Sequence, residues 1–306
     1  MPIECDPSIM RDIGICREWG FPIEVEDDSA RLRRDADLLV PAWVEEEARR
    51  VAWSAVRAHG YLEIGSTNDE ALVRACAGAP QGTLIYAERQ TAGKGRIGRK
   101  WVSAAGAGLY FTLVLRPRQS LETWPSLTHV ASVALYRSLR DLSLYRLTVA
   151  DLCLDLKWPN DVLLSGKKVA GILLETALRG ENAQAAVVGV GVNVLPHSVP
   201  AELTASATSI AGEAGVAVPR RWLLIRFLAH FRVGYRLFEA GEFGEIIEQW
   251  KNCSTMWNGV EITVQEGTRS KSAVTCGLTK TGALRIRTEE GSEETLLAGD
   301  VSIRRR

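Results

Sequence analysis

The chain has 306 residues, enough for one large domain with small attachments, and its 37 Lys and Arg residues balance 37 Asp and Glu residues. A neutral chain has no overall field that favours nucleic acid, so an anion site must be built locally from positioned cations and amides. The cysteines are scattered and form no C-x-x-C pair, which argues against a zinc site or a disulfide framework. The N-terminus does not resemble a signal peptide, and no apolar run approaches the roughly 20 residues of a membrane span. These features predict a cytoplasmic protein.

The first forty residues differ in composition from the rest. Through Arg50 the chain has 13 acidic and 7 basic residues. The amphipathic stretch SIMRDIGICREWGFPIEVE is too short for an independent core. From Pro41 the segment VEEEARRVAWSAVRAHG has helical periodicity and ends in glycine. We therefore predict a separate segment at 1–40 and a packed domain that begins near residue 41.

The next segment, GSTNDEALVRACAGA, predicts a helix with a polar start. Ser66, Thr67 and Asn68 are N-cap candidates, and such a helix start also favours an anion. GTLIYAE then predicts a strand, and GLYFTLVLRP predicts the following strand. The glycine-rich segment between them therefore joins strand to strand.

This glycine-rich segment, ERQTAGKGRIGRKW, spans residues 88–101 and has G-x-G-x-x-G spacing. A dinucleotide-binding turn needs a helix directly after the glycines and an acidic residue ~20 positions later, and neither is evident. A protein kinase is excluded because V-A-I-K, H-R-D and D-F-G are absent. Four cations lie among the glycines: Lys94, Arg96, Arg99 and Lys100. The segment predicts a phosphate or carboxylate site, with a solvated hairpin tip as an equal alternative.

The second half of the chain predicts further strands and helices. Residues 127–144 predict a buried helix, LCLDLKWPNDVLLSGKKVAGILLETAL a strand pair, and AQAAVVGVGVNV another strand. Helices are expected at about 222–240 and 243–250, followed by short strands typical of a small β-barrel. The predicted fold class is α+β, with a mixed-sheet domain at 41–254 and a small C-terminal β-barrel at 255–306.

Four segments in this order resemble the biotin protein ligase family: GSTNDEA, QTAGKGRIGRKW, KWPNDVLLSGKKVAGILLE and GVGVNV. GALRIRTEEGSEETLLAGDVSIR also resembles that family's C-terminal small barrel. The resemblance implies a biotin/lipoate ligase-like catalytic domain that uses ATP and Mg²⁺. Biotin would attack the α-phosphate of ATP to give biotinyl-adenylate. A lysine of biotin carboxyl carrier protein, an acetyl-CoA carboxylase subunit, would then take the biotinyl group.

The resemblance also implies roles for individual residues. It places the following residues at biotin: Ser66, Thr67, Asn68, Gln90, Lys94, Gly95, Arg96 and Lys168. It places another group at ATP or the adenylate: Gly93, Arg99, Lys157, Asn160, Asp161 and Asn193. Arg96 and Lys168 are the catalytic candidates because both could neutralise charge on the carboxylate or the phosphate. Asp161 is the candidate for organising magnesium, and Asn193 would face the adenine.

Each of these residues also allows a plainer role. Ser66 to Asn68 could form only a helix cap, and Trp101 and Trp158 could serve only packing. Lys157 and Asp161 could form an exposed ion pair of little energetic weight. The family usually has Arg where this chain has Lys94, which keeps the charge but loses bidentate geometry.

Three other functions stay open. A lipoate ligase or octanoyl transferase of the same fold is the nearest enzyme, and a biotin sensor without catalysis is a second alternative. A biotin-responsive DNA-binding repressor is the third, since residues 8–41 resemble the recognition helix and wing of a winged helix-turn-helix. The acidic character of this remnant and the lack of preceding helices predict no operator binding, unless the chain starts further upstream. A homodimer is compatible with the sequence.

Overall fold

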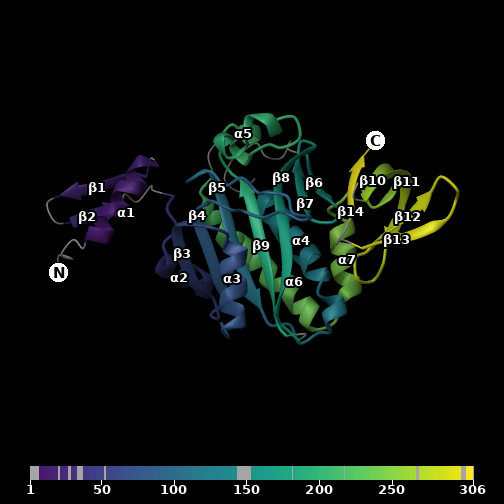
Figure 1. Cartoon of the computed structure of the whole chain (residues 1–306), viewed down its shortest axis with the longest axis horizontal. Coiled ribbons are helices and arrows are strands. Elements are labelled where there is room, and N and C mark those ends of the chain that lie inside the picture. Colours follow the sequence, from purple (N-terminus) through teal and green to yellow (C-terminus); the bar gives the residue numbers. More distant parts are fainter. Residues whose placement is uncertain are drawn as a thin grey trace.

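The structure is a computed structural model that describes residues 7–19, 21–26, 29–32, 37–51, 53–142, 153–180, 182–216, 218–266, 269–297 and 301–305. A mixed sheet forms its centre, with helices on both faces, and a smaller sheet lies at the C-terminal end (Figure 1). This arrangement confirms the predicted α+β class. Among the described residues, no helix is both long and apolar enough to cross a membrane.

The central sheet has seven strands in the order β3-β4-β5-β9-β8-β7-β6. Their bounds are β3 (Arg57–Ile64), β4 (Thr83–Gln90), β5 (Gly108–Leu115), β6 (Leu154–Lys157), β7 (Asp161–Leu164), β8 (Lys167–Arg179) and β9 (Asn182–Asn193). Only β3 and β4 pair in parallel, and the other neighbours are antiparallel. The glycine-rich segment therefore joins two adjacent antiparallel strands, β4 and β5, as the sequence predicts.

Alternating side chains divide the core between the two faces of this sheet. Ile85, Val114 and Val187 pack beneath α3 (Thr67–Cys76) in a small cluster. Their neighbours on the opposite face belong to the main core, which α4 (Ser126–Arg140) and α6 (Arg220–Glu239) cover. The helices α2 (Pro41–Arg50), α5 (Ile210–Ala214) and α7 (Phe243–Lys251) complete the domain, with 3-10 turns at Leu121–Thr123, Pro196–Ser198 and Ala201–Leu203.

The predicted helix over residues 44–60 is wrong in its second half. α2 ends at Arg50, and residues from Arg57 onward form β3. The chain turns because Trp53 enters the core, where its ring stacks on Phe231 at a centroid distance of 5.9 Å. Tertiary packing therefore overrides the local helical periodicity.

The C-terminal strands form a separate five-stranded antiparallel sheet in the order β13-β12-β11-β10-β14. Their bounds are β10 (Asn258–Glu266), β11 (Arg269–Leu278), β12 (Leu284–Thr288), β13 (Glu293–Leu296) and β14 (Val301–Arg305). Among the described residues, no pairing joins β13 to β14, which lie at the two edges. The predicted small β-barrel thus corresponds to this antiparallel sheet, whose described strands do not close into a ring.

A turn of this sheet docks on the central domain. The carbonyl of Gly282 accepts a hydrogen bond of 3.0 Å from Trp158 Nε1, and the carbonyl of Thr281 accepts one of 3.2 Å from Ser126 Oγ. A Cβ on Gly282 would lie 2.3 Å from the ring of His129, so glycine is required for this close approach. His129 also packs edge-on against Trp250.

His129 is expected to make the protein acid-sensitive. Burial lowers its pKa from 6.5 to about 4, although the carbonyls of Pro125 and Gly282 act to raise it. Below pH 6.5 the unfolded chain binds a proton that the native state does not bind, so stability falls as the pH approaches 4. We expect urea unfolding to show a loss of about 2–3 kcal/mol between pH 7 and pH 4.5 from this residue alone. The loss should be absent from His129→Leu, and an equal loss in both proteins would contradict the assignment.

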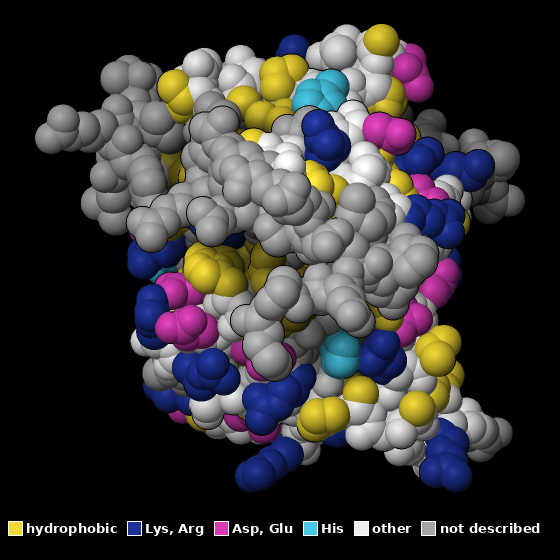
Figure 2. All heavy atoms as spheres, turned by 90° about the vertical axis from the view of Figure 1, so that its left-hand side faces the viewer, with side chains coloured by type: hydrophobic (Ala, Val, Ile, Leu, Met, Phe, Trp, Pro, Cys, Tyr) yellow, Lys and Arg dark blue, Asp and Glu magenta, His cyan; other side chains and the backbone are white. Residues whose placement is uncertain are grey.

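The N-terminal residues form a small unit at one end of the molecule (Figure 1). It contains α1 (Pro7–Glu18) and an antiparallel hairpin of β1 (Ile23–Glu26) and β2 (Ser29–Leu32). Phe21 reaches the central domain, where its ring lies 3.4 Å from the Cβ position of Gly106 and 5.7 Å from the guanidinium carbon of Arg220. Figure 2 views the molecule from this end, and the described acidic and basic side chains are intermixed on this face.

Candidate active site

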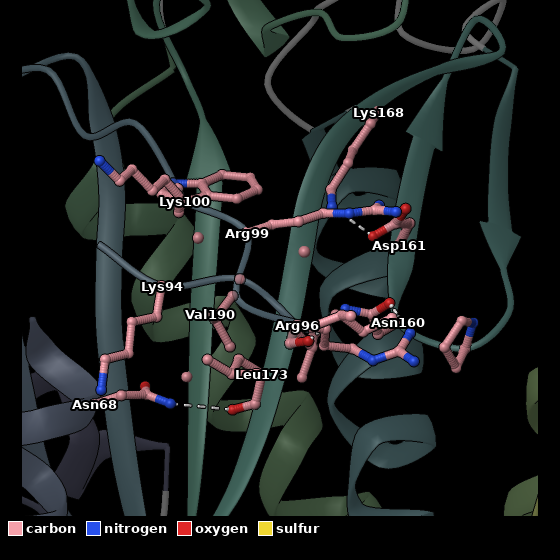
Figure 3. Close-up of a pocket in the computed structure, with 18 of the residues that line it drawn as sticks. Asn68, Lys94, Arg96, Arg99, Lys100, Asn160, Asp161, Lys168, Leu173 and Val190 are labelled. Atoms are coloured by element: carbon pink, nitrogen blue, oxygen red, sulfur yellow. Dashed lines mark hydrogen bonds and ion pairs between the residues drawn. The ribbon is translucent and has the colours of Figure 1, made fainter. Parts of the chain in front are cut away.

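Two adjoining hollows, of about 170 Å³ and about 970 Å³, lie along the glycine-rich loop. Loop residues 94–97 and 99–101 line both, and β8 and β9 contribute to the floor of the smaller one (Figure 3). Most of the predicted site residues line the smaller hollow: Ser66, Thr67, Asn68, Gln90, Lys94, Gly95, Arg96, Arg99, Lys157, Asn160, Asp161 and Lys168. Gly93 lines only the larger hollow. The structure thus brings together residues from four separate segments of the chain.

The start of α3 forms one wall of the smaller hollow. Ser66 Oγ accepts a hydrogen bond of 3.4 Å from the amide of Asp69, so the predicted N-cap is confirmed. Thr67 donates from its amide to Gln90 Oε1 at 2.8 Å, and Gln90 Nε2 donates to Ser103 Oγ at 2.9 Å. Ser66 is thus both a cap and a site residue, and Gln90 fixes the helix start to the end of β4.

The glycine-rich loop is folded back on itself. The amide of Gly95 donates to the carbonyl of Arg99 at 2.7 Å, and the amide of Trp101 donates to the carbonyl of Gly93 at 2.9 Å. Gly98 has a φ of +67°, which glycine adopts without strain. Backbone hydrogen bonds therefore close the loop into a hairpin.

Two cations fasten this loop to opposite walls of the hollow. Lys94 forms an ion pair with Asp69 in the first turn of α3, and this hydrogen bond raises the pKa of Lys94. Arg96 donates to Asn160 Oδ1 at 3.0 Å, on the segment between β6 and β7. The loop therefore crosses the site from the start of α3 to the segment between β6 and β7.

Lys168 and Asp161 form the charged pair at the far wall (Figure 3). Lys168 Nζ lies 2.6 Å from Asp161 Oδ1 and 5.3 Å from the centre of the Trp101 ring. Lys157 and Asp161 face each other in the backbone register of β6 and β7, so Asp161 lies between two lysines of the site. Lys168 is one-third exposed, so its ammonium group can approach a ligand in the hollow.

Glycines in the floor strands make room for the site side chains. Gly171 on β8 lies opposite Gly191 on β9. A Cβ on Gly191 would lie 2.6 Å from the indole of Trp101, and a Cβ on Gly171 would lie 3.1 Å from Lys168 Nζ. The glycines of GVGVNV thus have a steric purpose that spacing alone does not reveal, and Trp101 proves to be part of the wall of the hollow.

Asn193 lines neither hollow. Its side chain is buried, and its Nδ2 donates to the carbonyl of Thr208 at 3.0 Å. This contact holds the end of β9, and a role of Asn193 at the adenine stays a prediction. Within the described parts of the chain, no group of three or more His, Cys, Asp or Glu residues could hold a metal ion. Asn160 and Asp161 still offer oxygen atoms of the kind that Mg²⁺ prefers.

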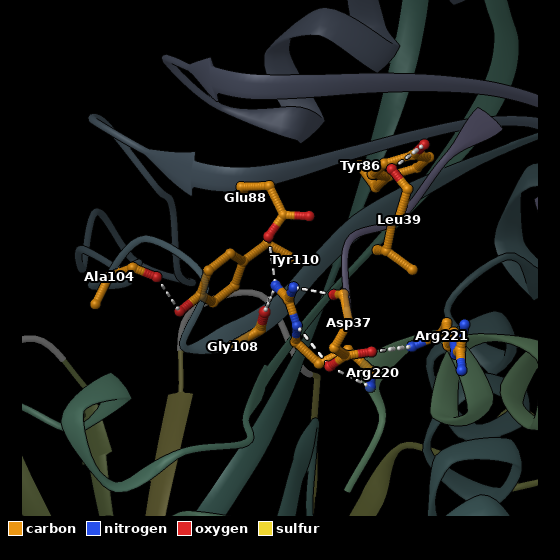
Figure 4. A network of polar contacts seen from close by, with 9 residues as sticks. All are labelled: Asp37, Leu39, Tyr86, Glu88, Ala104, Gly108, Tyr110, Arg220 and Arg221. Carbon is orange, nitrogen blue, oxygen red and sulfur yellow. Dashed lines mark hydrogen bonds and ion pairs between the residues drawn. The ribbon is translucent and has the colours of Figure 1, made fainter. Parts of the chain in front are cut away.

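A charged network surrounds the buried side chain of Arg220 (Figure 4). Arg220 at the start of α6 contacts Glu88 Oε2 at 2.5 Å, and both side chains are 2% exposed. Asp37 Oδ2 accepts from the amide and from Nε of Arg220, at 2.8 and 3.1 Å. Glu88 belongs to the strand that leads into the glycine-rich loop, so this network ties the chain near residue 37 to the base of the site.

Comparisons with known proteins agree with this architecture. Residues 64–193 match the biotin/lipoate A/B protein ligase family, and residues 259–304 match the biotin protein ligase C-terminal domain. The biotin–acetyl-CoA-carboxylase ligase of Paracoccus denitrificans is 38% identical over 234 residues, which cover 74% of this chain and 93% of that protein. The bifunctional ligase/repressor BirA of Bacillus subtilis is 32% identical over 243 residues, which cover 78% of this chain and 72% of BirA.

Solved structures show the same similarity. Biotin protein ligase from Aquifex aeolicus, in complex with biotin and ATP, has a TM-score of 0.67 and 29% identity, and the match covers 81% of this chain and 99% of that one. The resemblance predicted from the four motifs is therefore confirmed, and the chain belongs to the biotin protein ligase family.

Proposed function

We propose that this protein activates biotin with ATP as biotinyl-adenylate and transfers the biotinyl group to a lysine of biotin carboxyl carrier protein, the acetyl-CoA carboxylase subunit. One observation carries the proposal. The start of α3, the glycine-rich loop and the Lys168–Asp161 pair line one hollow, although they come from distant parts of the chain. The family members named above are ligases of this kind.

The two ends of the hollow suit the two substrates. Ser66, Thr67 and Gln90 offer polar groups to the ureido ring of biotin, which needs hydrogen-bond partners when buried. Lys157, Asn160 and Asp161 at the other end suit the nucleotide, with Arg99 and the amides near Gly93 in the adjoining loop. Lys94, Gly95, Arg96 and Lys168 line the same hollow, and we expect them to contact the carboxylate of biotin where it meets the α-phosphate.

The chemistry requires positioning and charge neutralisation rather than a covalent nucleophile. Arg96 and Lys168 bring two positive charges to the reacting groups, and Asp161 orients the Lys168 ammonium. We expect the loop, which lines the hollow, to fold over the reactive acyl phosphate and keep water from it. Mg²⁺, held by nucleotide phosphates with Asp161 and Asn160, would neutralise phosphate charge.

Three further features belong to the proposal. The chain divides into a segment at 1–40, a catalytic domain at 41–254 and a C-terminal domain at 255–306. Residues 1–40 carry 10 acidic and 5 basic residues, which supports the absence of operator binding. The protein works in the cytoplasm and allows a homodimer.

The test is transfer of labelled biotin to a purified carrier domain in the presence of ATP and Mg²⁺. Arg96→Gly should release biotinyl-adenylate into solution, because the hydrogen bond that fastens the loop to Asn160 is lost. Free adenylate in the filtrate should rise by about tenfold relative to the wild type while transfer to the carrier falls. Wild-type protein that binds biotin but labels no carrier would support the sensor. Transfer of lipoate or octanoate in preference to biotin would identify the related acyl transferases.

A further inference from the structure

The polar atoms of Asn68 are occupied by the protein itself. Its Nδ2 donates to Glu175 Oε2 at 2.7 Å and lies 3.4 Å from the carbonyl of Leu173, both on β8. Its Oδ1 accepts from the hydroxyl of Thr112 on β5 at 2.6 Å. Asn68 is 4% exposed and Thr112 is fully buried. An amide with two donors and an acceptor engaged in this way has little capacity left for a ligand.

A glycine in the central sheet leaves space for the Asn68 side chain. A Cβ on Gly189 of β9 would lie 2.0 Å from Asn68 Oδ1, so only glycine leaves the space that the amide fills. Asn68 is the second residue of α3, and its side chain therefore contacts three adjacent strands, β5, β9 and β8. These contacts fix where α3 begins, and hence where Ser66 and Thr67 stand in the wall of the hollow.

Thr67 is held by the same group of residues. Its hydroxyl lies 2.9 Å from Thr112 Oγ1 and 3.0 Å from Gln90 Oε1. Ser66, by contrast, uses only a lone pair when it caps the amide of Asp69, so its hydroxyl proton is available to an acceptor. The contacts thus leave Ser66 a hydroxyl proton and Thr67 a second lone pair for a ligand, whereas the amide of Asn68 is bound to the sheet.

We infer that Asn68 is a positioning residue of the biotin pocket rather than a contact of biotin, and that the carboxylate of Glu175 is the partner that holds it. This inference rests on the proposed function for the identity of the ligand. It changes the role of Asn68 from a contact of biotin to the anchor of α3. It also adds Glu175 and Thr112 to the residues on which biotin affinity depends.

An exchange of the two partners tests this inference. Asn68→Asp would place two carboxylates together where the native pair has a donor and an acceptor, and both cannot remain ionised at this separation. Asn68→Asp with Glu175→Gln restores a donor and an acceptor in reversed order and keeps the net charge. Glu175→Gln alone is the reference for the double variant.

KM for biotin and KM for ATP are measured for each variant in the transfer assay, together with the thermal midpoint. We expect Asn68→Asp to raise KM for biotin by about tenfold or more, because a hydrogen bond to a charged group is lost. KM for ATP should change by less than about threefold, since Asn68 lies across the hollow from Asp161 (Figure 3). The double variant should recover most of the loss relative to Glu175→Gln. Asn258→Asp, at the exposed start of β10, is the matched control and should behave as wild type.

The outcomes separate the two roles of Asn68. If the double variant binds biotin as poorly as Asn68→Asp, the amide contacts biotin directly and the inference fails. Equal increases in both KM values would also overturn it, because they indicate a general loss of structure. If the wild type neither binds nor transfers biotin, the proposed function fails. The thermal midpoint then tests the anchor alone, through loss in Asn68→Asp and recovery in the double variant.

Discussion

Lys168→Ala is expected to lower kcat for carrier biotinylation by about 100- to 1000-fold, the usual effect of removing a group that stabilises developing charge. The Lys168 ammonium is held by Asp161 at 2.6 Å and lies against the face of Trp101, so it is oriented before any substrate arrives. Its loss leaves the charge of the carboxylate and the α-phosphate less well neutralised. Pyrophosphate release, measured in single-turnover experiments with biotin and ATP, reports the first step directly.

Lys167→Ala is the matched control for this prediction. Lys167 is the adjacent residue on β8, but its Nζ donates to the carbonyl of Thr204 at 3.0 Å and it does not line either hollow. Its replacement should change kcat by less than about threefold. Lys168→Arg should retain part of the activity, because it keeps the charge but changes the geometry. Full activity of Lys168→Ala would assign the neutralising role to another cation, with Arg96 as the first candidate.

Local patterns in the sequence predicted most of the elements. The helices at 126–140, 220–239 and 243–251 lie within a few residues of their expected positions, because apolar residues recur along one face. The strand-to-strand placement of the glycine-rich loop was also correct. The exception over 44–60 has a tertiary cause, since Trp53 leaves the helix to stack in the core.

Pairings between distant residues could not be predicted from one sequence. Spacing suggested Lys157 as a partner of Asp161, but it did not indicate that the pairing of β7 with β8 would also bring Lys168 to this carboxylate. The motif S-T-N indicated contacts with a ligand, but it did not indicate that Asn68 would meet Glu175 across 107 residues of chain. Such contacts depend on strand register, because a shift by one residue would move every side chain of the strand to the other face of the sheet.

Arg220→Met is expected to reduce the free energy of unfolding by about 3–5 kcal/mol, because it leaves the Glu88 carboxylate buried without its counter-ion. The same change removes the hydrogen bond from Arg220 Nε to Asp37. The Asp37 carboxylate also accepts hydrogen bonds from the backbone amides of Arg220 and Arg221 at the start of α6. Burial alone would lower the pKa of Arg220, but Glu88 and Asp37 outweigh it and raise that pKa. Arg226→Met, at a partly exposed ion pair with Asp141, is the control and should cost about 1 kcal/mol or less. Urea unfolding at pH 7 provides the measurement.

The pH dependence of the loss in free energy of unfolding caused by Arg220→Met distinguishes a lost ion pair from a simple packing defect. Burial raises the pKa of Glu88, and Arg220 opposes that shift in the native protein. Without Arg220 the pKa of Glu88 should rise further. At a pH below this raised pKa, the Glu88 carboxyl group is protonated in the folded variant but ionised in the unfolded chain. The variant should therefore regain stability relative to wild type as the pH falls from 7 toward 5, since a neutral carboxyl group tolerates burial better than a carboxylate. Glu88→Gln with Arg220→Met should show a smaller deficit at pH 7 that does not change with pH. A constant deficit in the single variant would mean that packing, and not the uncompensated charge, accounts for the loss.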